Sequence, residues 1–457
     1  MPLAIKDKQV LVLGLGDTGL SALRWLSRQG AVLSVADTRE YPPGLETVRA
    51  EMPQVAIHLG VFSDELLQHQ DLLVVSPGVP LATQQIQQAI AQGVAVAGDV
   101  ELFAQYKPAG AKVIAITGAN GKSTVTTLVG EMCKAAGLKT VVAGNIGLPV
   151  LDTLNGEVPD IYVLELSSFQ LETTASLDAD AATVLNLSED HMDRYDGMAA
   201  YAAAKARIFS GSGVQVLNRQ DAWSAGMALP GRQQVSFGLD SATAEQDYGL
   251  IADGAETWLA RGETRLLRTG ELKIAGLHNA ANALAALALC RAAGLDEAPL
   301  LAALRDFKGL PHRVEWVAQI GGIAFYDDSK GTNVGATCAA LAGLPQKVVL
   351  IAGGDGKGQD FSPMLAAVRQ NARAVVLIGR DAPLLAAALK PANLPLLMAD
   401  TLPAAVRMAF AAARRGDAVL LSPACASFDM FRNYLHRAEV FCDAVRALAG
   451  SAEEVLR

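Results

Sequence analysis

The stretch ITGANGKST, residues 116–124, decides the fold of the central part of this chain. It follows the apolar run KVIA and precedes VTTLVGEMCKAAG, whose apolar residues recur at helical spacing. A glycine-rich loop between a strand and a helix places backbone amides and the helix N-terminus around an anion. The stretch therefore predicts a phosphate site in an α/β domain. The alternative is a tight strand-to-helix turn that binds nothing.

Five residues of this loop have the chemistry that a nucleoside triphosphate requires. Gly118 and Gly121 let the backbone approach a phosphate, and Lys122 reaches toward the β- and γ-phosphates. The hydroxyl of Ser123 or Thr124 is suited to hold Mg²⁺. The first glycine comes two positions later than in the common GxxxxGK[ST] motif, so this loop is shorter than the usual one.

Outside the loop, short apolar runs alternate with amphipathic segments, which is typical of βαβ units. Strands are expected at QVLVLGLG, VLSVADT, DLLVVSPG, VAVAG, KVIAITG, TVVAGN, DIYVLELSS, AATVLNLS, VQVLN, IAFYDDSK, KVVLIAGG, AVVLIGR, LPLLMAD and AVLLSP. Residues 248–276 carry short strand-like runs with turn residues instead, which predicts a small antiparallel appendage. The sequence thus predicts an α/β fold with parallel sheets.

Two interruptions divide the pattern, at YKPAG and at KGLPHRVEW. At about 150 residues per domain, a chain of 457 residues is expected to hold about three domains. We therefore predict three α/β domains in series, at residues 1–106, 107–310 and 311–457.

Composition narrows the classes of function. The net charge is −9 and no block of Lys or Arg stands out, which argues against a nucleic-acid partner. The five cysteines form no CxxC pair, so neither a disulfide framework nor a zinc site is expected. The same cysteine usage predicts a reducing, cytoplasmic location. No apolar run reaches the roughly 18 residues that a membrane helix needs, so membrane insertion is not expected.

A second glycine-rich loop, GLGDTG at residues 14–19, follows the first predicted strand, and Asp37 ends the next one. This GxGxxG pattern is found in dinucleotide-binding proteins, but it requires only a turn, a close approach and a helix-packing contact. Three interpretations stay open from the residues alone: a nicotinamide or flavin, another phosphorylated nucleotide, or plain turn geometry. A second nucleotide site in a chain that already binds ATP favours a nucleotide-linked substrate.

Three further polar residues carry both a functional and a purely structural interpretation. Glu165 ends a predicted central strand, where a carboxylate is either a ligand of Mg²⁺ or a cap or surface group. His191, in NLSEDHMDRY, is either a metal ligand or part of a helix start that Ser188 would cap. Lys205, in AYAAAKARIF, is by itself most simply explained as a solvated helix lysine.

The motifs TGANGKST, LELSSFQLE, NLSEDHMDRY, GLHNAANALAA, GLPHR, DDSKGTN, GGDGKGQDF and LLSPACAS occur in this order along nearly the whole chain. In this set the chain resembles the Mur ligases, and among them the members that add D-glutamate. The resemblance implies a Rossmann-like N-terminal domain, a P-loop ATPase-like central domain and a Rossmann-like C-terminal domain. It also implies an ATP-dependent amide ligase of peptidoglycan precursor synthesis that acts through an acyl phosphate.

For the nucleotide substrate, the resemblance implies that the first domain binds the UDP part of UDP-N-acetylmuramoyl-L-alanine. The implied contacts are Asp17, Thr18, Asp37, Thr38, Arg39 and Gly78, with Asn145 from the central domain. The GxGxxG loop is then not a nicotinamide site.

For ATP and metal, the resemblance implies contacts from both remaining domains. The implied ATP contacts are Gly118, Asn120, Gly121, Lys122, Ser123, Thr124, Asn279, Arg313 and Asp328. One Mg²⁺ would be held by Ser123 or Thr124 and Glu165, and a second by His191 and Lys205. In this family the lysine at the position of Lys205 is carbamylated by CO₂, which turns a cation into a carboxylate-like ligand. Lys122, Glu165, His191 and Lys205 are then the catalytic residues.

For D-glutamate, the matching positions are Lys330, Thr332, Lys357, Ser427, Phe428 and Tyr434. Lys357 is expected to pair with a carboxylate of the amino acid. The DNPR motif of the ligases that add a diamino acid is absent from the sequence, which favours D-glutamate. No obligate protein partner is implied.

Other classes of function make different predictions. Another Mur ligase would use a different amino acid, and a folylpolyglutamate synthetase would not need a leading α/β domain of about 100 residues. A nicotinamide-dependent dehydrogenase would leave ITGANGKST unexplained. A nucleotide-gated switch or motor would hydrolyse ATP without a small-molecule acceptor.

Overall fold

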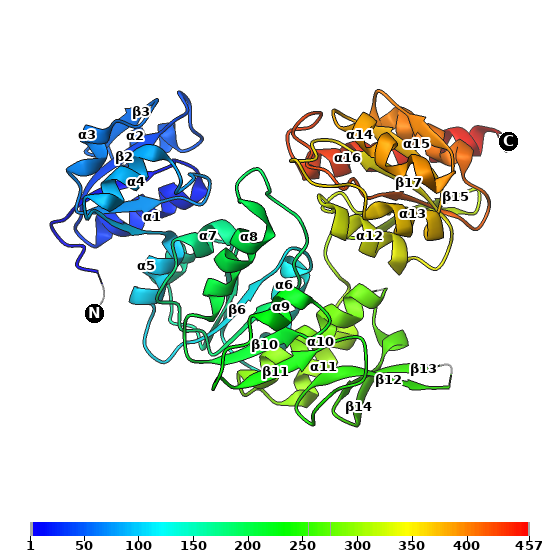
Figure 1. Cartoon of the computed structure of the whole chain (residues 1–457), viewed down its shortest axis with the longest axis horizontal. Coiled ribbons are helices and arrows are strands. Elements are labelled where there is room, and N and C mark those ends of the chain that lie inside the picture. Colours follow the sequence, from blue (N-terminus) through cyan, green and yellow to red (C-terminus); the bar gives the residue numbers. More distant parts are fainter. Residues whose placement is uncertain (1–2, 255, 275, 456–457) are drawn as a thin grey trace. The chain divides into compact units, whose positions relative to one another are not determined.

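The structure, a computed structural model, describes residues 3–254, 256–274 and 276–455 (Figure 1). The chain divides into two compact units. The first unit comprises the described residues of Met1–Asn186, Ala199–Arg268 and Asn282–Arg305. The second comprises those of Leu187–Met198, Thr269–Ala281 and Asp306–Arg457.

The first sheet has five parallel strands in the order β3-β2-β1-β4-β5. Its strands are β1 (Gln9–Leu13), β2 (Val32–Asp37), β3 (Ala56–Leu59), β4 (Leu72–Val75) and β5 (Ala95–Ala97). The connecting helices are α1 (Asp17–Arg28), α2 (Leu45–Glu51), α3 (Asp64–Gln68), α4 (Gln84–Ala91) and α5 (Asp99–Tyr106). The strand order reverses direction at β1, and ligands bind beyond the strand ends at such a switch point.

The second sheet has nine strands in the order β14-β13-β12-β11-β10-β9-β6-β8-β7. They are β6 (Lys112–Thr117), β7 (Thr140–Gly144), β8 (Ile161–Glu165), β9 (Ala181–Val184), β10 (Val214–Asn218), β11 (Gln234–Phe237), β12 (Tyr248–Asp253), β13 (Glu256–Arg261) and β14 (Thr264–Arg268). Only β12, β13 and β14 are joined in antiparallel fashion. They extend the parallel sheet through a pairing of β12 with β11, so the predicted appendage is its antiparallel edge.

Helical segments connect these strands. They are α6 (Lys122–Ala135), η1 (Val150–Asn155), α7 (Ser168–Glu172), α8 (Gly197–Ala206), η2 (Arg207–Phe209), α9 (Ala222–Gly226), η3 (Thr269–Glu271), α10 (Leu277–Ala292) and α11 (Glu297–Asp306). The segment before α8 forms turns, and the helix begins only at Gly197. The alternative in which Ser188 caps a helix start is therefore wrong.

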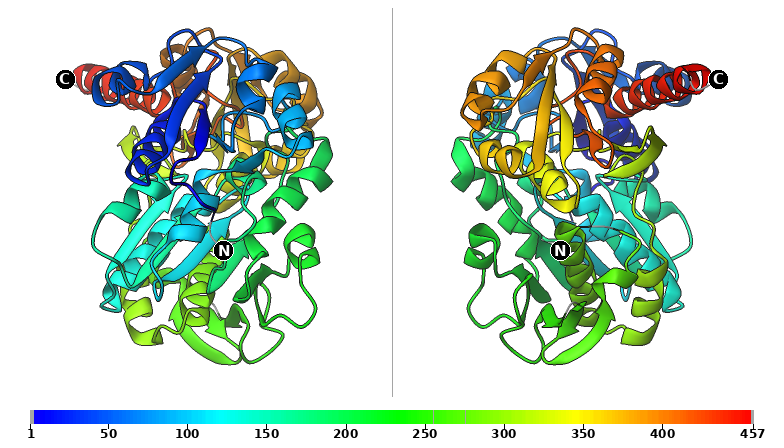
Figure 2. Two further views of the ribbon diagram at one scale, coloured as in Figure 1. Left: turned by 90° about the vertical axis from the view of Figure 1, so that its left-hand side faces the viewer. Right: turned by 90° about the vertical axis from the view of Figure 1, so that its right-hand side faces the viewer.

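The third sheet has six strands in the order β15-β16-β20-β17-β18-β19, parallel except for the β15–β16 pair. The strands are β15 (Glu315–Ile320), β16 (Ile323–Asp327), β17 (Val348–Gly353), β18 (Ala372–Ile378), β19 (Leu396–Met398) and β20 (Ala418–Leu421). The helical segments are α12 (Val334–Gly343), α13 (Met364–Asn371), α14 (Ala382–Leu389), η4 (Lys390–Ala392), α15 (Leu402–Ala412) and α16 (Tyr434–Val455), the red helix in Figure 2.

Strand β17 shows why the apolar runs predict parallel strands. Val348 and Leu350 pack into the core with residues of α12, α13 and α14. Val349 and Ile351 pack into a second core with residues of α15 and α16. A strand buried on both faces needs apolar residues at every position, and only a sheet covered by helices on both sides provides this.

The predicted α/β fold is confirmed. Within the part of the chain that the structure describes, no helix combines the length and the apolar character needed to span a bilayer.

Candidate active site

The glycine-rich loop between β6 and α6 depends on two glycines. Gly121 precedes α6 with φ at 83°, and a Cβ there would lie 2.5 Å from Asn282 Oδ1. Gly118 has φ at 152°, and its Cβ would lie 3.0 Å from the Cβ of Leu185. Positive φ is strained for other residues, so only glycine fits both positions. The structure thus has the predicted order of strand, glycine-rich loop and helix.

Lys122, Ser123 and Thr124 open the first turn of α6. The Lys122 ammonium donates hydrogen bonds of 2.8 Å to the carbonyl oxygens of Gly118 and Ala119, so its charge lies on the loop. Ser123 and Thr124 are buried at the helix N-terminus, where backbone amides and the helix dipole favour an anion. The arrangement fits a polyphosphate.

Asn186 holds this loop from the end of the neighbouring strand β9. Its Oδ1 accepts from the Asn120 amide at 2.8 Å, and its Nδ2 donates to the Asn120 carbonyl at 3.1 Å. The Asn186 carbonyl accepts from the Ala119 amide at 2.8 Å. Sequence reasoning missed Asn186, although its place directly after a predicted central strand was a signal.

Glu165 ends β8, the strand next to β6 in the sheet, and is 1% exposed. Its Oε1 accepts a hydrogen bond of 2.7 Å from Asn145 Nδ2. Its Oε2 is buried and has no hydrogen-bond partner among the described residues. A buried carboxylate oxygen without a hydrogen-bond partner is suited to bind a cation that prefers oxygen ligands, such as Mg²⁺.

Lys205 is 1% exposed, so its interpretation as a solvated helix lysine is wrong. Its Nζ donates to the Gly118 carbonyl at 3.0 Å and to Thr117 Oγ1 at 3.2 Å. It also lies 4.8 Å from the centroid of the Tyr201 ring. Helix α8 thus directs a buried amine at the start of the phosphate loop. Lysines are rarely buried to this degree, which marks Lys205 as a functional candidate.

His191 lies in the turn segment before α8 and has φ at 59°. This segment belongs to the second unit. Its Nε2 is 3.7 Å from Asp190 Oδ2. Asp190 in turn contacts the Lys357 ammonium at 2.5 Å and Asn333 Nδ2 at 3.4 Å. Asp190 therefore connects the segment that holds His191 to Lys357, a residue predicted to bind D-glutamate.

A cavity of about 710 Å³ lies in the first unit, beyond the ends of β1 and β7. It brings together every residue predicted to contact the nucleotide substrate: Asp17, Thr18, Asp37, Thr38, Arg39, Gly78 and Asn145. Gln170 of α7 also lines it. Sequence reasoning missed Gln170, although it lies in the motif LELSSFQLE that also contains Glu165.

Asp37 is already engaged within this cavity. Its Oδ2 accepts from the Leu15 amide at 2.7 Å and from Arg39 Nη2 at 2.7 Å. Burial raises the pKa of Asp37, but the hydrogen bonds from Arg39 and the Leu15 amide outweigh it and lower the pKa to about 2. Asp37 therefore fixes the loop after β1 and orients the Arg39 guanidinium. A dinucleotide ribose would have to compete for this carboxylate.

Asp328, in the second unit, is a buried acid that was predicted to contact ATP. Burial raises the pKa of Asp328 to about 7, against a hydrogen bond of 2.6 Å from Ser422 Oγ and the nearby charge of Arg313. The other predicted contact in this unit, Asn279, lies in the first turn of α10. The phosphate loop belongs to the first unit.

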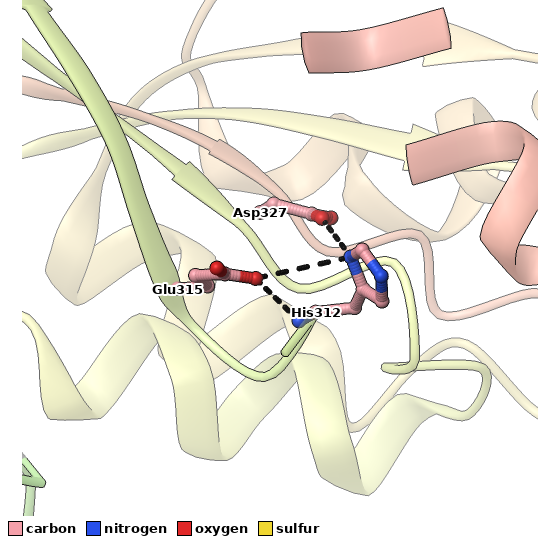
Figure 3. A group of neighbouring side chains, drawn as sticks. All are labelled: His312, Glu315 and Asp327. Atoms are coloured by element: carbon pink, nitrogen blue, oxygen red, sulfur yellow. Dashed lines mark hydrogen bonds and ion pairs between the residues drawn. The ribbon is translucent and has the colours of Figure 1, made fainter. Parts of the chain in front are cut away.

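His312 and Asp327 are the sequence neighbours of Arg313 and Asp328, and they bond to each other (Figure 3). His312 Nδ1 lies 2.6 Å from Asp327 Oδ2, and the His312 amide donates to Glu315 Oε2 at 2.8 Å. The three side chains meet the distance requirement for a metal site. The two hydrogen bonds account for their arrangement without a metal, and they tie the Arg313 loop to the end of β16.

The residues predicted for D-glutamate lie in the second unit. Lys330 Nζ is 4.1 Å from the centroid of the Tyr434 ring, a cation–π contact. Ser427 is buried, and Thr332 and Lys357 are half-buried. Phe428 is 73% exposed, so the structure does not bring its side chain into a packed pocket.

Arg437 of α16 organises the loops that carry these residues, and sequence reasoning missed it. It is fully buried and donates to the Ser329 carbonyl at 2.7 Å, to Ser329 Oγ at 3.0 Å and to the Cys425 carbonyl at 3.1 Å. Burial lowers its pKa to about 10. The sequence offered no clear signal, because the stretch NYLHRAEVF also holds Asn433, His436 and Glu439.

Comparison with protein families gives three matches in series. Residues 8–98 match the Mur ligase MurD-like N-terminal domain, residues 116–290 the Mur ligase middle domain, and residues 312–425 the Mur ligase glutamate ligase domain.

Full-length relatives agree with these matches. The chain is 68% identical to the UDP-N-acetylmuramoylalanine–D-glutamate ligase of Methylobacillus flagellatus over 446 residues, 98% of each chain. It is 59% identical to the enzyme of the same name from Thiobacillus denitrificans, over 99% of each chain.

Solved structures support the fold. The chain resembles UDP-N-acetylmuramate-alanine ligase MurC from Thermotoga maritima, with a TM-score of 0.58 and 21% identity over 96% of this chain and all of that one. It resembles MurF from Acinetobacter baumannii with a TM-score of 0.59 and 17% identity, over 97% and 93% of the two chains. From its three matched domains and its full-length relatives, the chain belongs to the Mur ligase family.

Proposed function

We propose that this chain is an ATP-dependent ligase that joins D-glutamate to UDP-N-acetylmuramoyl-L-alanine in peptidoglycan precursor synthesis, forming ADP and phosphate. Relatives that are 50–68% identical over nearly the whole chain carry the name of this activity, which supports the proposal. The dehydrogenase and switch-protein alternatives have no comparable support. The cytoplasm is the expected location, because the cysteine pattern fits a reducing compartment.

The observation that carries the proposal is the convergence of Lys205 and Glu165 on the phosphate loop. Lys205 bonds to the Gly118 carbonyl, and Glu165 ends the strand beside β6. One carboxylate oxygen of Glu165 has no hydrogen-bond partner in the part of the chain that the structure describes. A loop that binds only a nucleotide would not need a buried amine beside it. A phosphoryl-transfer site needs several charged groups around the transferred phosphate.

For the nucleotide substrate, the proposed site is the cavity lined by Asp17, Thr18, Asp37, Thr38, Arg39, Gly78 and Asn145. The loop after β1 and the Arg39 guanidinium would hold the uridine diphosphate, because amides and guanidinium groups bind phosphate. Asn145 bonds to Glu165, so the cavity adjoins the proposed metal ligand.

For ATP, the proposed contacts are the loop residues Gly118, Asn120, Gly121, Lys122, Ser123 and Thr124, with Asn279, Arg313 and Asp328 from the second unit. Ser123 or Thr124 and Glu165 would hold one Mg²⁺, and His191 and Lys205 the other. Mg²⁺ neutralises phosphate charge when bound.

A carbamate on Lys205 is part of the proposal. The neutral ε-amine would add to CO₂, an N–C bond would form and one proton would leave. The product is an anion in place of a cation. The conversion would supply oxygen ligands that Mg²⁺ prefers.

The residues then have distinct tasks in the reaction. Lys122 stabilises the γ-phosphoryl group of ATP while it passes to the L-alanyl carboxylate, which gives an acyl phosphate and ADP. Lys330, Thr332, Lys357, Ser427, Phe428 and Tyr434 are the proposed contacts of D-glutamate. Its neutral amine attacks the acyl carbon, the amide C–N bond forms, phosphate leaves and the amine loses a proton.

The test is ATP-dependent phosphate release by the purified protein with UDP-N-acetylmuramoyl-L-alanine and, separately, D-glutamate, L-glutamate, L-alanine and meso-diaminopimelate. Release with D-glutamate alone is expected. Release with another amino acid would retain the ligase but overturn the specificity, and no release with any would overturn the proposed activity.

A further inference from the structure

Asp99 is a buried acid for which the proposed mechanism has no task. It opens helix α5, the segment that follows the first sheet, and it is 2% exposed. Its Oδ2 accepts from Gln170 Nε2 at 3.4 Å, and its Oδ1 is buried with no hydrogen-bond partner among the described residues. Burial raises the pKa of Asp99 to about 6, against that hydrogen bond and the backbone amides of Val100 and Asp99 itself. A carboxyl group in such surroundings destabilises the fold, so its presence calls for a function.

Gln170, its partner, faces the nucleotide-substrate cavity. The Gln170 Oε1 accepts from the Ser167 amide and the Ser167 hydroxyl, both at 3.1 Å, as part of the capping box of α7. A side-chain amide is symmetric in shape, and only its partners decide which end is the donor. The Ser167 amide requires an acceptor and the Asp99 carboxylate requires a donor, so the two together fix one orientation.

A structural role alone does not explain Asp99, because Glu101 already holds α5 in place. Glu101 Oε2 accepts from the Ala175 amide at 2.6 Å and the Ser176 amide at 2.9 Å, and its Oε1 accepts from Ser176 Oγ at 2.6 Å. These three bonds join α5 to the segment directly after α7. Asp99 adds to them one hydrogen bond between α5 and α7, of 3.4 Å, and that bond ends on a residue of the cavity.

We propose that Asp99 is a positioning residue for the nucleotide substrate: it holds the Gln170 amide with its nitrogen as donor, so that the second N–H serves the substrate in the cavity. The amide nitrogen has two hydrogens, and Asp99 uses only one. The group that would receive the other is an oxygen of the UDP-linked sugar or its L-alanyl substituent. This inference rests on the proposed binding of UDP-N-acetylmuramoyl-L-alanine in this cavity.

The test compares Asp99→Leu, Gln170→Ala and the double variant in the full-length enzyme. Each single variant is expected to raise the KM for the nucleotide substrate about tenfold, the worth of one hydrogen bond, with kcat and the KM values for ATP and D-glutamate within about twofold. Because Asp99 acts through Gln170, the double variant is expected to match Gln170→Ala. Additive effects, or an equal rise in all three KM values, would overturn the proposal.

Two further variants separate positioning from folding. Asp99→Asn retains an oxygen acceptor and is expected to restore the nucleotide KM to within about twofold of the wild-type value. Glu101→Gln weakens the anchor of the same helix and is expected to lower Tm without this KM shift. If Asp99→Leu does not fold, Asp99→Ala takes its place, and a wild-type KM in that variant would refute the role.

Calorimetric binding of UDP-N-acetylmuramoyl-L-alanine to each variant, without ATP, keeps this inference apart from the proposed activity. If the wild-type enzyme binds the nucleotide but releases no phosphate, the activity fails while the role of Asp99 is still measured. Equal affinity of the wild type and Asp99→Leu would refute the positioning role whatever the activity.

Discussion

The carboxylate of Asp190 and the ammonium of Lys357 form an ion pair at 2.5 Å, with only 11% and 17% of their side chains exposed. Asp190 precedes His191, a proposed metal ligand, and Lys357 is a proposed contact of D-glutamate. The cation expected to receive a substrate carboxylate therefore already holds one from the protein. Binding of D-glutamate must replace this partner or share the ammonium with it.

Lys357→Ala is expected to raise the KM for D-glutamate roughly 10- to 100-fold, because a charge-assisted hydrogen bond to the amino acid is lost. The KM for the nucleotide substrate should stay unchanged. Steady-state phosphate release at varied D-glutamate measures this. Lys347→Ala is the matched control, since Lys347 is an exposed lysine directly before β17 that bonds to the Gln370 carbonyl. An unchanged D-glutamate KM in Lys357→Ala would remove Lys357 from the site.

Asp190→Asn tests the same pair from the other side. A neutral amide competes less well for the ammonium than a carboxylate does, so the KM for D-glutamate is expected to fall about three- to tenfold. Direct titration of D-glutamate in the presence of a nonhydrolysable ATP analogue gives the affinity independently of turnover. A weaker affinity would mean that Asp190 orients Lys357 and does not compete with the substrate.

Lys122→Ala is expected to fold normally and to lose activity about 10²–10³-fold, the loss that follows from removal of one preorganised charge stabiliser. Lys122 is half-buried and its ammonium donates to the Gly118 and Ala119 carbonyls at the loop surface, so stability should change little. Phosphate release and thermal unfolding measure the two effects. Lys134→Ala, on the exposed side of the same helix beside Glu131, should retain full activity. Near-normal turnover of Lys122→Ala would refute the phosphate assignment.

Lys205→Ala is expected to be inactive and to regain part of its activity when short carboxylic acids such as acetate or propionate are added. The small acid would enter the space left by the side chain and supply the oxygens of the proposed carbamate. The same acids should not restore Lys122→Ala, whose missing group is a cation. If the folded Lys205 variant binds ATP and no acid restores activity, the carbamate is not supported.

Asp328→Asn is expected to stabilise the protein more at pH 8 than at pH 5. The pKa of Asp328 rises on folding from 3.8 to about 7 because of burial, so between these values the folded protein holds a proton that the unfolded chain has lost. Stability therefore falls as pH rises through this window and is constant above it. Replacing the acid removes a penalty on the order of 2–4 kcal/mol at pH 8 and little of it near pH 4.

Thermal unfolding of both proteins at several pH values checks this prediction, with Asp443→Asn as the control because that carboxylate lies in solvent beside Arg446. The KM of Asp328→Asn for ATP should rise at the same time, since the ionised acid is a proposed ligand of the nucleotide. A gain in Tm that is equal at pH 5 and pH 8 would mean that Asp328 is not a raised-pKa acid.

The sequence alone predicted those parts of the fold that depend on local pattern. Parallel strands such as β17 are buried on both faces, so their apolar runs are unbroken and easy to recognise. Strand β3 was missed because it is a short edge strand with mostly exposed residues. Strands β11 and β15 alternate or mix buried and exposed residues and were missed as well. The exact domain boundaries stay predictions.

The phosphate loop was also readable from the sequence, because its chemistry lies in consecutive residues whose backbone forms the site. The neighbours of a polar side chain that come from distant segments were not. Only the tertiary structure places Lys205 against Gly118, 87 positions away, and Asp99 against Gln170, 71 positions away. Whether a lysine or an aspartate is solvated or buried depends on what packs over it, and packing is decided by the whole chain. Motif order therefore determined the family and the fold, whereas burial and distant partners, which set the chemistry of each site, required the folded molecule.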